Sequence, residues 1–163
     1  MKWFKNNWFT IIGFFLVVVL LFTYLNSNYG VMGGLKQYFK ISVSNCEVIK
    51  KEDTHGGFHG DGDLTAILDC SKFKQNIYNK KNCFSLPVED EYIIDLIDSY
   101  ELNKAFNYNS SEDFDLTKIQ NGFYCFYGRN LHDDGSSYKH YLNFDLTIYN
   151  SDNNILYYYD FDM

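Results

Sequence analysis

Apolar residues follow two patterns along this chain, and the first is one unbroken run. It extends from Trp8 to Leu25, WFTIIGFFLVVVLLFTYL, inside an uncharged stretch from Asn6 to Leu35. Eighteen helical residues cover about 27 Å, close to the thickness of the hydrocarbon core of a bilayer. Trp8 and Tyr24 lie near the ends of the run, where aromatic rings favour the headgroup level. The run predicts a transmembrane helix.

Charges on either side of the run orient it. Lys2 and Lys5 precede it, and the next basic residue is Lys36. Cytoplasmic flanks carry the excess of Lys and Arg, so the N-terminus is expected inside the cell and the remainder outside. The expected parts are a cytoplasmic N-terminus 1–7, a single-pass helix 8–25, a flexible juxtamembrane spacer 26–40 and an extracytoplasmic domain 41–163.

A cleaved signal peptide is the competing interpretation of the same N-terminus. The apolar run is longer than a usual signal-peptide core of about 7 to 15 residues. The segment NSNYGVMGG that follows contains no A-x-A-like cleavage pair. The sequence therefore favours an uncleaved anchor in the cell membrane.

The second pattern consists of short segments in which apolar and polar residues alternate, as in half-buried strands. The predicted strands are Ile41–Lys50, Leu64–Cys70, Phe123–Tyr127, Leu142–Ile148 and Ile155–Phe161. The third is apolar on both faces and is expected near the centre of the sheet. The turn residues NSDNN join the last two, which predicts a hairpin.

Two helices are predicted between the strands. Phe73 and Ile77 are four residues apart in Ser71–Lys80, and apolar residues recur at three- and four-residue spacing up to Tyr100 after Pro87. Proline and the acids that follow it suit a first helical turn. The predicted fold class is therefore α+β: a transmembrane helix, then an antiparallel sheet of about five strands with two helices on one face.

The charge of the outer domain limits its partners. Only Lys2 and Lys5 precede the anchor, so the exterior part holds 12 of the 14 basic and all 21 acidic residues, a formal charge of −9. Such a surface repels nucleic acids and anionic headgroups. We therefore expect no nucleic-acid partner.

Four cysteines lie in the exterior part: Cys46, Cys70, Cys83 and Cys125. Disulfides persist outside the cytoplasm, and four cysteines permit three pairings. Cys70 with Cys83 closes a modest loop, and Cys46 can meet Cys125 if their strands are neighbours. Buried free thiols are the alternative. The absence of a C-x-x-C sequence leaves a zinc knuckle or a redox pair without support.

The stretch Asp53–Asp63, DTHGGFHGDGD, carries the densest set of candidate ligands. The candidates for a ligand or metal site are His55, His59, Asp61 and Asp63. Histidine and carboxylate ligands suit zinc, iron or manganese, and a further ligand is expected from His132, Asp133 or Asp134. The spacing does not fit an EF-hand, and the segment lacks the lysine of a phosphate loop.

A structural role explains the same segment without any ligand. Glycines permit the turn, and histidine and aspartate side chains bond to the backbone and to each other. His55 or His59 paired with Asp61 then holds two strands together.

Nucleophilic catalysis has little support in the sequence. No G-x-S-x-G sequence occurs. The remaining nucleophile candidate is Cys125 beside His132 or His140, which we do not favour.

With FSLP at Phe84–Pro87 and the closing LYYYDFD, the DTHGGFHGDGD motif resembles a family of small uncharacterised proteins from Gram-positive bacteria. The resemblance covers most of Ile41–Met163 and implies a bacterial cell-surface domain, with no known activity.

We expect a non-enzymatic binding module without a cofactor. It would contact another membrane or secreted protein as an accessory subunit, sensor or immunity-type protein. The alternative is a surface hydrolase that uses a divalent metal such as zinc in the loop 53–63.

Overall fold

The fold was determined as a computed structural model, in which residues 8–41, 43, 45–56, 61–72, 82–111, 113–132 and 140–163 are described. The helices are α2 (Trp8–Tyr38), α3 (Glu91–Ser99), α4 (Leu102–Phe106) and the 3₁₀ helix η1 (Leu116–Lys118). The strands are β1 (Glu47–Asp53), β2 (Gly62–Asp69), β3 (Cys83–Ser85), β4 (Gly122–His132), β5 (His140–Asn150) and β6 (Ile155–Asp162). The α+β class is confirmed.

The described strands form one antiparallel sheet in the order β1-β2-β6-β5-β4-β3. The predicted hairpin is confirmed, because β5 pairs with β6 from Asn150 opposite Ile155 onward. The short strand β3 was not predicted and brings the sheet to six strands. It lies at one edge, so β4 is an inner strand next to that edge, and β6 and β5 form the centre.

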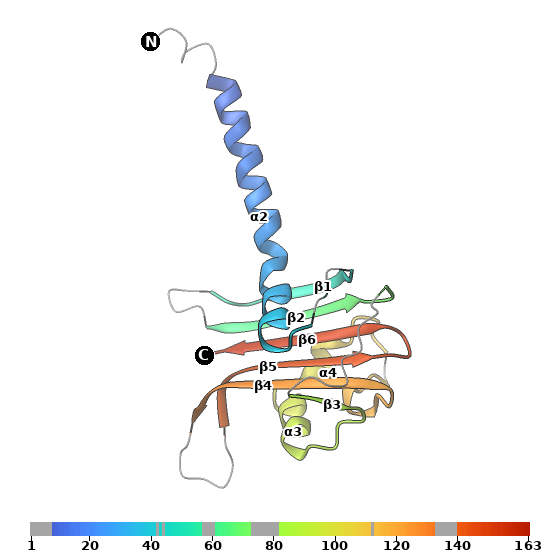
Figure 1. Ribbon diagram of the computed structural model, residues 1–163. Coiled ribbons are helices and arrows are strands. Elements are labelled where there is room, and N and C mark those ends of the chain that lie inside the picture. The colour runs from blue at the N-terminus through green and yellow to red at the C-terminus, as the bar shows by residue number, and fades with distance from the viewer. Residues whose placement is uncertain are drawn as a thin grey trace.

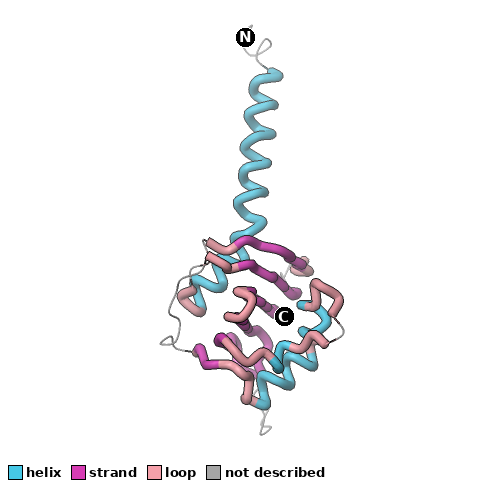
Figure 2. Tube along the Cα trace, turned by 90° about the vertical axis from the view of Figure 1, so that its right-hand side faces the viewer, coloured by secondary structure: helices cyan, strands magenta, loops and turns pink. Residues whose placement is uncertain are grey.

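Helices cover both faces of the sheet, which differs from the predicted arrangement on one face (Figures 1 and 2). On one face, α3 and α4 pack over a core that contains Ile97, Phe106 and Tyr159. On the other, the C-terminal turns of α2 bury Val31 and Leu35 against β2 and β6. The helix α3 corresponds to the second predicted helix, whereas residues 73–80 of the first lie outside the described part.

The helix α2 passes through the expected spacer without interruption and ends at Tyr38. The prediction of a flexible spacer at 26–40 is therefore wrong, because Val31 and Leu35 pack on the sheet with no exposed surface. Toward its N-terminus the same helix projects away from the domain (Figure 1). Within the residues whose side chains the structure describes, which leave out 8–11 and 22–29 of α2, no helix is long and apolar enough to cross a membrane.

The start of α3 depends on an aspartate. The Asp90 carboxylate accepts a hydrogen bond from the Tyr92 backbone N–H at 3.0 Å and so caps the helix. Pro87 follows a cis peptide bond and lies before the cap, outside the first helical turn predicted for it. The sequence placed the helix correctly but assigned its start to the wrong residue.

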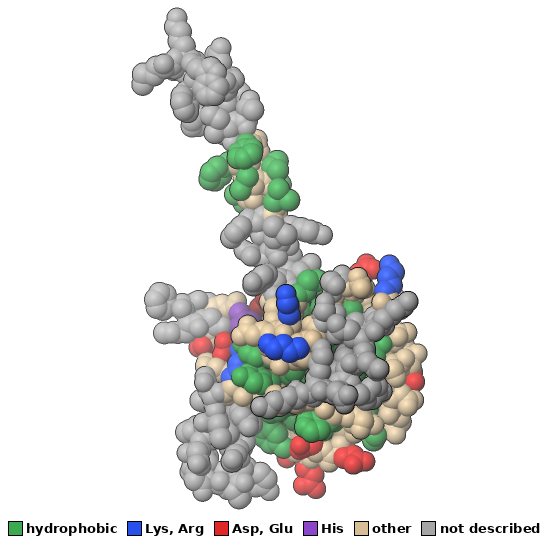
Figure 3. Space-filling model, in the orientation of Figure 1, with side chains coloured by type: hydrophobic (Ala, Val, Ile, Leu, Met, Phe, Trp, Pro, Cys, Tyr) green, Lys and Arg blue, Asp and Glu red, His purple; other side chains and the backbone are tan. Residues whose placement is uncertain are grey.

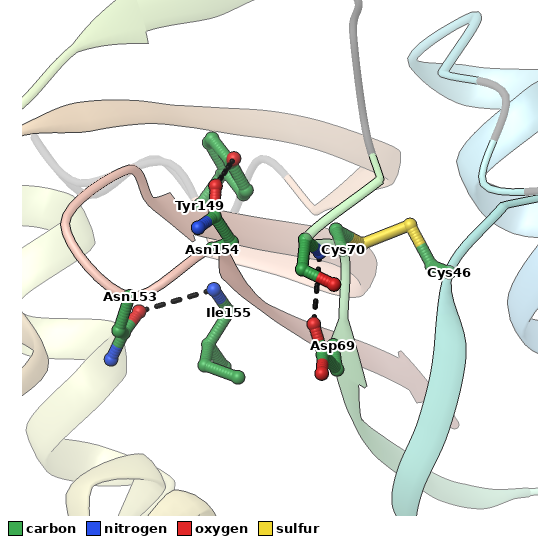
Figure 4. Close-up of a disulfide and its surroundings, with 8 residues drawn as sticks. Cys46, Asp69, Cys70, Tyr149, Asn153, Asn154 and Ile155 are labelled. Atoms are coloured by element: carbon green, nitrogen blue, oxygen red, sulfur yellow. Dashed lines mark hydrogen bonds between the residues drawn. A yellow bond between two sulfur atoms is a disulfide. The ribbon is translucent and has the colours of Figure 1, made fainter.

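Two disulfides, Cys46–Cys70 and Cys83–Cys125, lie on the face of the sheet that α2 covers. These pairs are one of the three combinations that the sequence left open, and no thiol is free among the described cysteines. Cys46–Cys70 lies near the β5–β6 turn (Figure 4). The Cys70 backbone N–H donates to the Asn154 carbonyl of that turn at 2.8 Å. The two bonds indicate an extracytoplasmic domain.

Candidate functional site

The segment DTHGGFHGDGD connects β1 to β2, as predicted. Thr54, the residue after β1, continues the pairing with Asp63 of β2: the Thr54 N–H donates to the Asp63 carbonyl, and the Asp63 N–H donates to the Thr54 hydroxyl, both at 2.8 Å. Gly62 has a φ of 153°, and a Cβ there would overlap the backbone of Thr54 and His55. Glycine at this position therefore permits a close approach of two backbones.

His55 bonds to Asp53, not to Asp61. Its Nδ1 lies 2.9 Å from Asp53 Oδ1, and its backbone N–H donates to the same oxygen at 3.2 Å. Partial burial acts to raise the pKa of Asp53, but the bonds from His55 and the charge of Lys51 outweigh it and hold that pKa below its ordinary value. Asp61 is exposed, and its backbone carbonyl accepts the N–H of Gly56.

Asp63 serves the other face of the sheet. Its carboxylate bonds to the Tyr159 hydroxyl, and burial together with this neighbouring charge raises the pKa of Tyr159. Asp160 alternates with Tyr159 along β6 and therefore points the opposite way. Burial raises the pKa of Asp160, and the charge of His55 is among the contributions that oppose this rise, so His55 lies on the face of Asp160. The described side chains of the motif do not converge.

The described residues hold no group of three His, Cys, Asp or Glu side chains suited to a metal ion. His59, Asp133 and Asp134 lie outside the described residues, as do the side chains of His132 and His140. Cys125 cannot act as a nucleophile, since its sulfur is bonded to Cys83. In its described part, the motif is a connection between two strands whose residues hydrogen-bond to one another.

A cluster of buried charges that the sequence analysis missed lies under α2. Asp145 of β5 is fully buried, and its Oδ1 accepts a hydrogen bond from the Tyr158 hydroxyl at 2.5 Å. Its Oδ2 lies 3.4 Å from Nε of Arg129, and the guanidinium of Arg129 also pairs with Asp160. Arg129 donates further to the Phe161 carbonyl at 3.0 Å. We refer to Arg129, Asp145, Tyr158 and Asp160 as the buried cluster.

Burial controls the protonation of this cluster. Burial and the neighbouring charge of Asp160 raise the pKa of Asp145 to about 7, although the bond from Tyr158 and the charge of Arg129 oppose this. Burial also raises the pKa of Asp160 and of Tyr158. Among the described residues, Asp145 Oδ2 and Arg129 Nε find no hydrogen-bond partner, although the two atoms lie 3.4 Å apart as an ion pair. One guanidinium thus serves two carboxylates, and the buried one takes up a proton near neutral pH.

The C-terminal end of α2 packs on the buried cluster. Gly34 lies against Tyr158, and the ring of Tyr38 lies under the guanidinium of Arg129, 5.4 Å from ring centroid to Cζ. Tyr38 also stacks on Tyr127 at 4.8 Å. One signal in the sequence pointed here, since Arg129 is the sole arginine of a chain that otherwise uses lysine. The arrangement couples the helix to the sheet.

Two hollows of about 400 Å³ open on the described surface. One lies near the β5–β6 turn, and several of its polar side chains are already bonded: Asn107 to Ser111, Asp115 to Thr117 and Asn153 to the N–H of Ile155. The other lies at the edge of the sheet beside β3 and α3 and is mostly aromatic. The aromatic hollow is the better candidate for a ligand, because exposed ring surface borders it, with Phe84 at 55% exposure.

Comparisons of the chain with protein families, with curated proteins and with solved structures find no match. The resemblance to small Gram-positive proteins through DTHGGFHGDGD remains a prediction.

Proposed function

We propose that this chain is a single-pass membrane protein whose extracytoplasmic α+β domain binds another membrane or secreted protein and performs no catalysis. One observation carries the proposal: α2 exposes apolar side chains on all sides in one half and packs on the sheet in the other. The exposed side chains include Ile12, Phe14, Phe15, Leu16, Leu20 and Leu21, at 40 to 70% exposure. A helix that is apolar all round needs a lipid or protein environment.

The length of the apolar run supports lipid as that environment. Trp8–Leu25 carries no charge over eighteen residues, and the exposed apolar side chains belong to this run. Figure 3 displays the hydrophobic side chains of α2 well away from the body of the domain. A hydrophobic surface of this extent is not stable in water.

Because α2 is continuous, it suits a role in positioning the domain relative to the proposed anchor, or in transmitting a movement between the two. No break separates the exposed half from Val31 and Leu35, which pack on the sheet. The domain is thereby held at a fixed distance from the proposed anchor. The acidic surface and the two disulfides suit an extracytoplasmic setting.

The anchor is tested by substituting Val17→Lys and Leu20→Lys together in the full chain and extracting cell membranes at alkaline pH. The native chain should stay in the membrane pellet, and the double variant should be released. A matched control, Gln37→Lys with Lys40 retained, places charge on α2 beyond the run and should remain in the pellet. Release of the native chain would contradict the anchor.

Binding to a partner is tested by crosslinking the full chain in intact cells and isolating complexes in mild detergent. A stoichiometric protein partner is expected, accessible from outside the cell. Recovery of the chain alone under conditions that preserve known membrane complexes would contradict the interaction role. Protease added to intact cells should digest the domain after its disulfides are reduced, and digestion confined to opened cells would contradict the orientation.

A further inference from the structure

The aromatic hollow lies on the sheet face that α3 covers, beside the three-residue strand β3. Figure 1 labels α3 and β3, which lie next to each other at this edge of the sheet. Its volume is about 400 Å³. Four aromatic rings and one acid dominate its lining: Phe84, Tyr92, Tyr124, Phe126 and Asp90. Tyr127 also borders it, but the ring of Tyr127 stacks on Tyr38 at the other face of the sheet. No Lys, Arg or His belongs to the lining that the structure describes. The hollow therefore combines ring surfaces with negative charge.

Contacts between the rings fix their positions. Phe84 stacks on Tyr124 with centroids 5.3 Å apart, and Tyr92 meets Phe126 edge to face at 5.8 Å. Phe84 remains 55% exposed. Apart from Met163, it is the most exposed large apolar side chain among the described residues that follow α2. An exposed phenylalanine beside a hollow offers a ring face to a ligand.

Negative charge reaches into the hollow from the start of α3. Asp90 lines it, and Glu89 is the exposed residue before Asp90. Burial raises the pKa of the Tyr124 hydroxyl, and the charges of Asp90 and Glu89 raise it further. An anionic ligand is disfavoured by this potential, whereas a cation is attracted.

We propose that the aromatic hollow binds a small quaternary ammonium compound, with its positive charge against the ring faces and beside the Asp90 carboxylate. Aromatic rings carry negative potential on their faces, and such cages are a recurrent way to recognise quaternary ammonium ions. The volume holds a trimethylammonium group together with the short chain that carries it. This proposal does not depend on the membrane anchor or on a protein partner.

The state of Asp90 favours ammonium over guanidinium. A guanidinium prefers two parallel hydrogen bonds to one carboxylate. Oδ1 of Asp90 already accepts the N–H of Tyr92 at 3.0 Å, so only part of this carboxylate remains for a ligand. A quaternary ammonium group donates no hydrogen bond and needs charge and ring surface alone.

The proposal is tested with choline and its uncharged isostere 3,3-dimethylbutanol. The full chain, purified in neutral detergent with ¹³C-labelled Phe and Tyr rings, is titrated with each compound by NMR. We expect choline to shift the ring signals and to bind at least tenfold more tightly than the alcohol. Equal affinities, or no shift with choline at millimolar concentrations, would overturn the proposal.

Three variants test whether the charge of Asp90 contributes to choline binding independently of its role as a helix cap. Asp90→Asn preserves helix capping, because Asn and Asp are comparable caps, and should weaken choline binding at least threefold. Asp95→Asn removes the same charge from an exposed position of α3 outside the lining and should leave binding within twofold. Phe84→Leu keeps an apolar side chain and should weaken binding by a similar factor to Asp90→Asn. Equal affinities of the Asp90 and Asp95 variants would exclude the proposed role of Asp90 and overturn the proposal.

Discussion

Gly34 of α2 lies directly against the hydroxyl of Tyr158 in β6, so that a Cβ at position 34 would overlap that oxygen. The hydroxyl donates to Oδ1 of the buried Asp145 at 2.5 Å. This contact joins the proposed anchor helix to the polar centre of the sheet. It also explains why a glycine stands inside a helix, where it is otherwise unfavourable.

Substitution Gly34→Ala should separate α2 from the sheet. The added methyl group forces Tyr158 or the helix to move, so we expect the free energy of unfolding to fall by about 1 to 3 kcal/mol, the usual cost of overpacking. Thermal unfolding of the full chain in detergent, followed by near-UV circular dichroism, measures the change.

Gly30→Ala is the matched control for that substitution. Its Cβ would lie 3.4 Å from the end of the Leu64 side chain, an ordinary contact. Alanine is favoured over glycine in a helix by up to about 1 kcal/mol, so this variant should be as stable as the native chain or slightly more so. Equal losses in both variants would contradict the Gly34–Tyr158 contact.

The buried cluster should make stability depend on pH below neutrality. Burial and the charge of Asp160 raise the pKa of Asp145 to about 7 in the folded chain, from an ordinary value of 3.8. The folded state therefore favours the protonated carboxyl, so its stabilising contribution is complete below pH 4 and is lost as the pH rises to 7. The loss is on the order of a few kcal/mol.

Asp145→Asn removes this titration while its side-chain oxygen still accepts the Tyr158 hydroxyl. Denaturation at pH 4.5 and 7.5 should show a smaller difference for this variant than for the native chain. Asp160, Asp162, Tyr158 and Arg129 are the charged or titratable groups that act on Asp145, and all remain. Asp98→Asn, an exposed change on α3, is the control. An unchanged pH dependence in the Asp145 variant would show that Asp145 does not titrate in this range.

The two disulfides should contribute unequal parts to stability. Cys46–Cys70 spans 24 residues and Cys83–Cys125 spans 42. Loop-closure entropy predicts losses of about 3 to 4 kcal/mol when each pair is replaced by serine, with the larger loss for the longer loop. Chemical denaturation of the two double-serine variants measures this. Mass spectrometry of unreduced peptides checks the pairing, and a Cys46–Cys125 peptide would contradict the structure.

His55 should contribute little to stability. Its bond to Asp53 lies near the surface, where such pairs are worth less than about 1 kcal/mol. His55→Ala is therefore expected to fold with nearly native stability. Thermal unfolding with and without added zinc measures both effects. A loss of several kcal/mol, or a zinc-dependent rise in the midpoint that His55→Ala abolishes, would favour a metal site instead.

Much of the fold could be predicted from local patterns. The alternation in Leu142–Ile148 and the turn residues after it predicted the β5–β6 hairpin, and the apolar spacing up to Tyr100 predicted α3. The three-residue strand β3 escaped prediction because it is too short for any period to show. Its place in the sheet depends on pairing with β4, far along the chain.

The polar positions of β5 illustrate what the patterns could not give. Asn143, Asp145 and Thr147 alternate with apolar residues, which is typical of a strand with one face in water. All three are buried, because the end of α2 covers that face. The buried cluster was missed for the same reason, and the motif Asp53–Asp63 received attention that its internal bonding does not support.

The sequence by itself determined the local elements: the apolar helix, the alternating strands, the helix before Tyr100 and the acidic character of the outer domain. These depend on neighbouring residues and on composition, which can be read along one chain. Only the tertiary structure decided the cysteine pairs, the covering of the second sheet face, the burial of Asp145 and the gathering of rings around Asp90. Each of these depends on residues that are distant in sequence and meet only when the sheet is assembled between its helices.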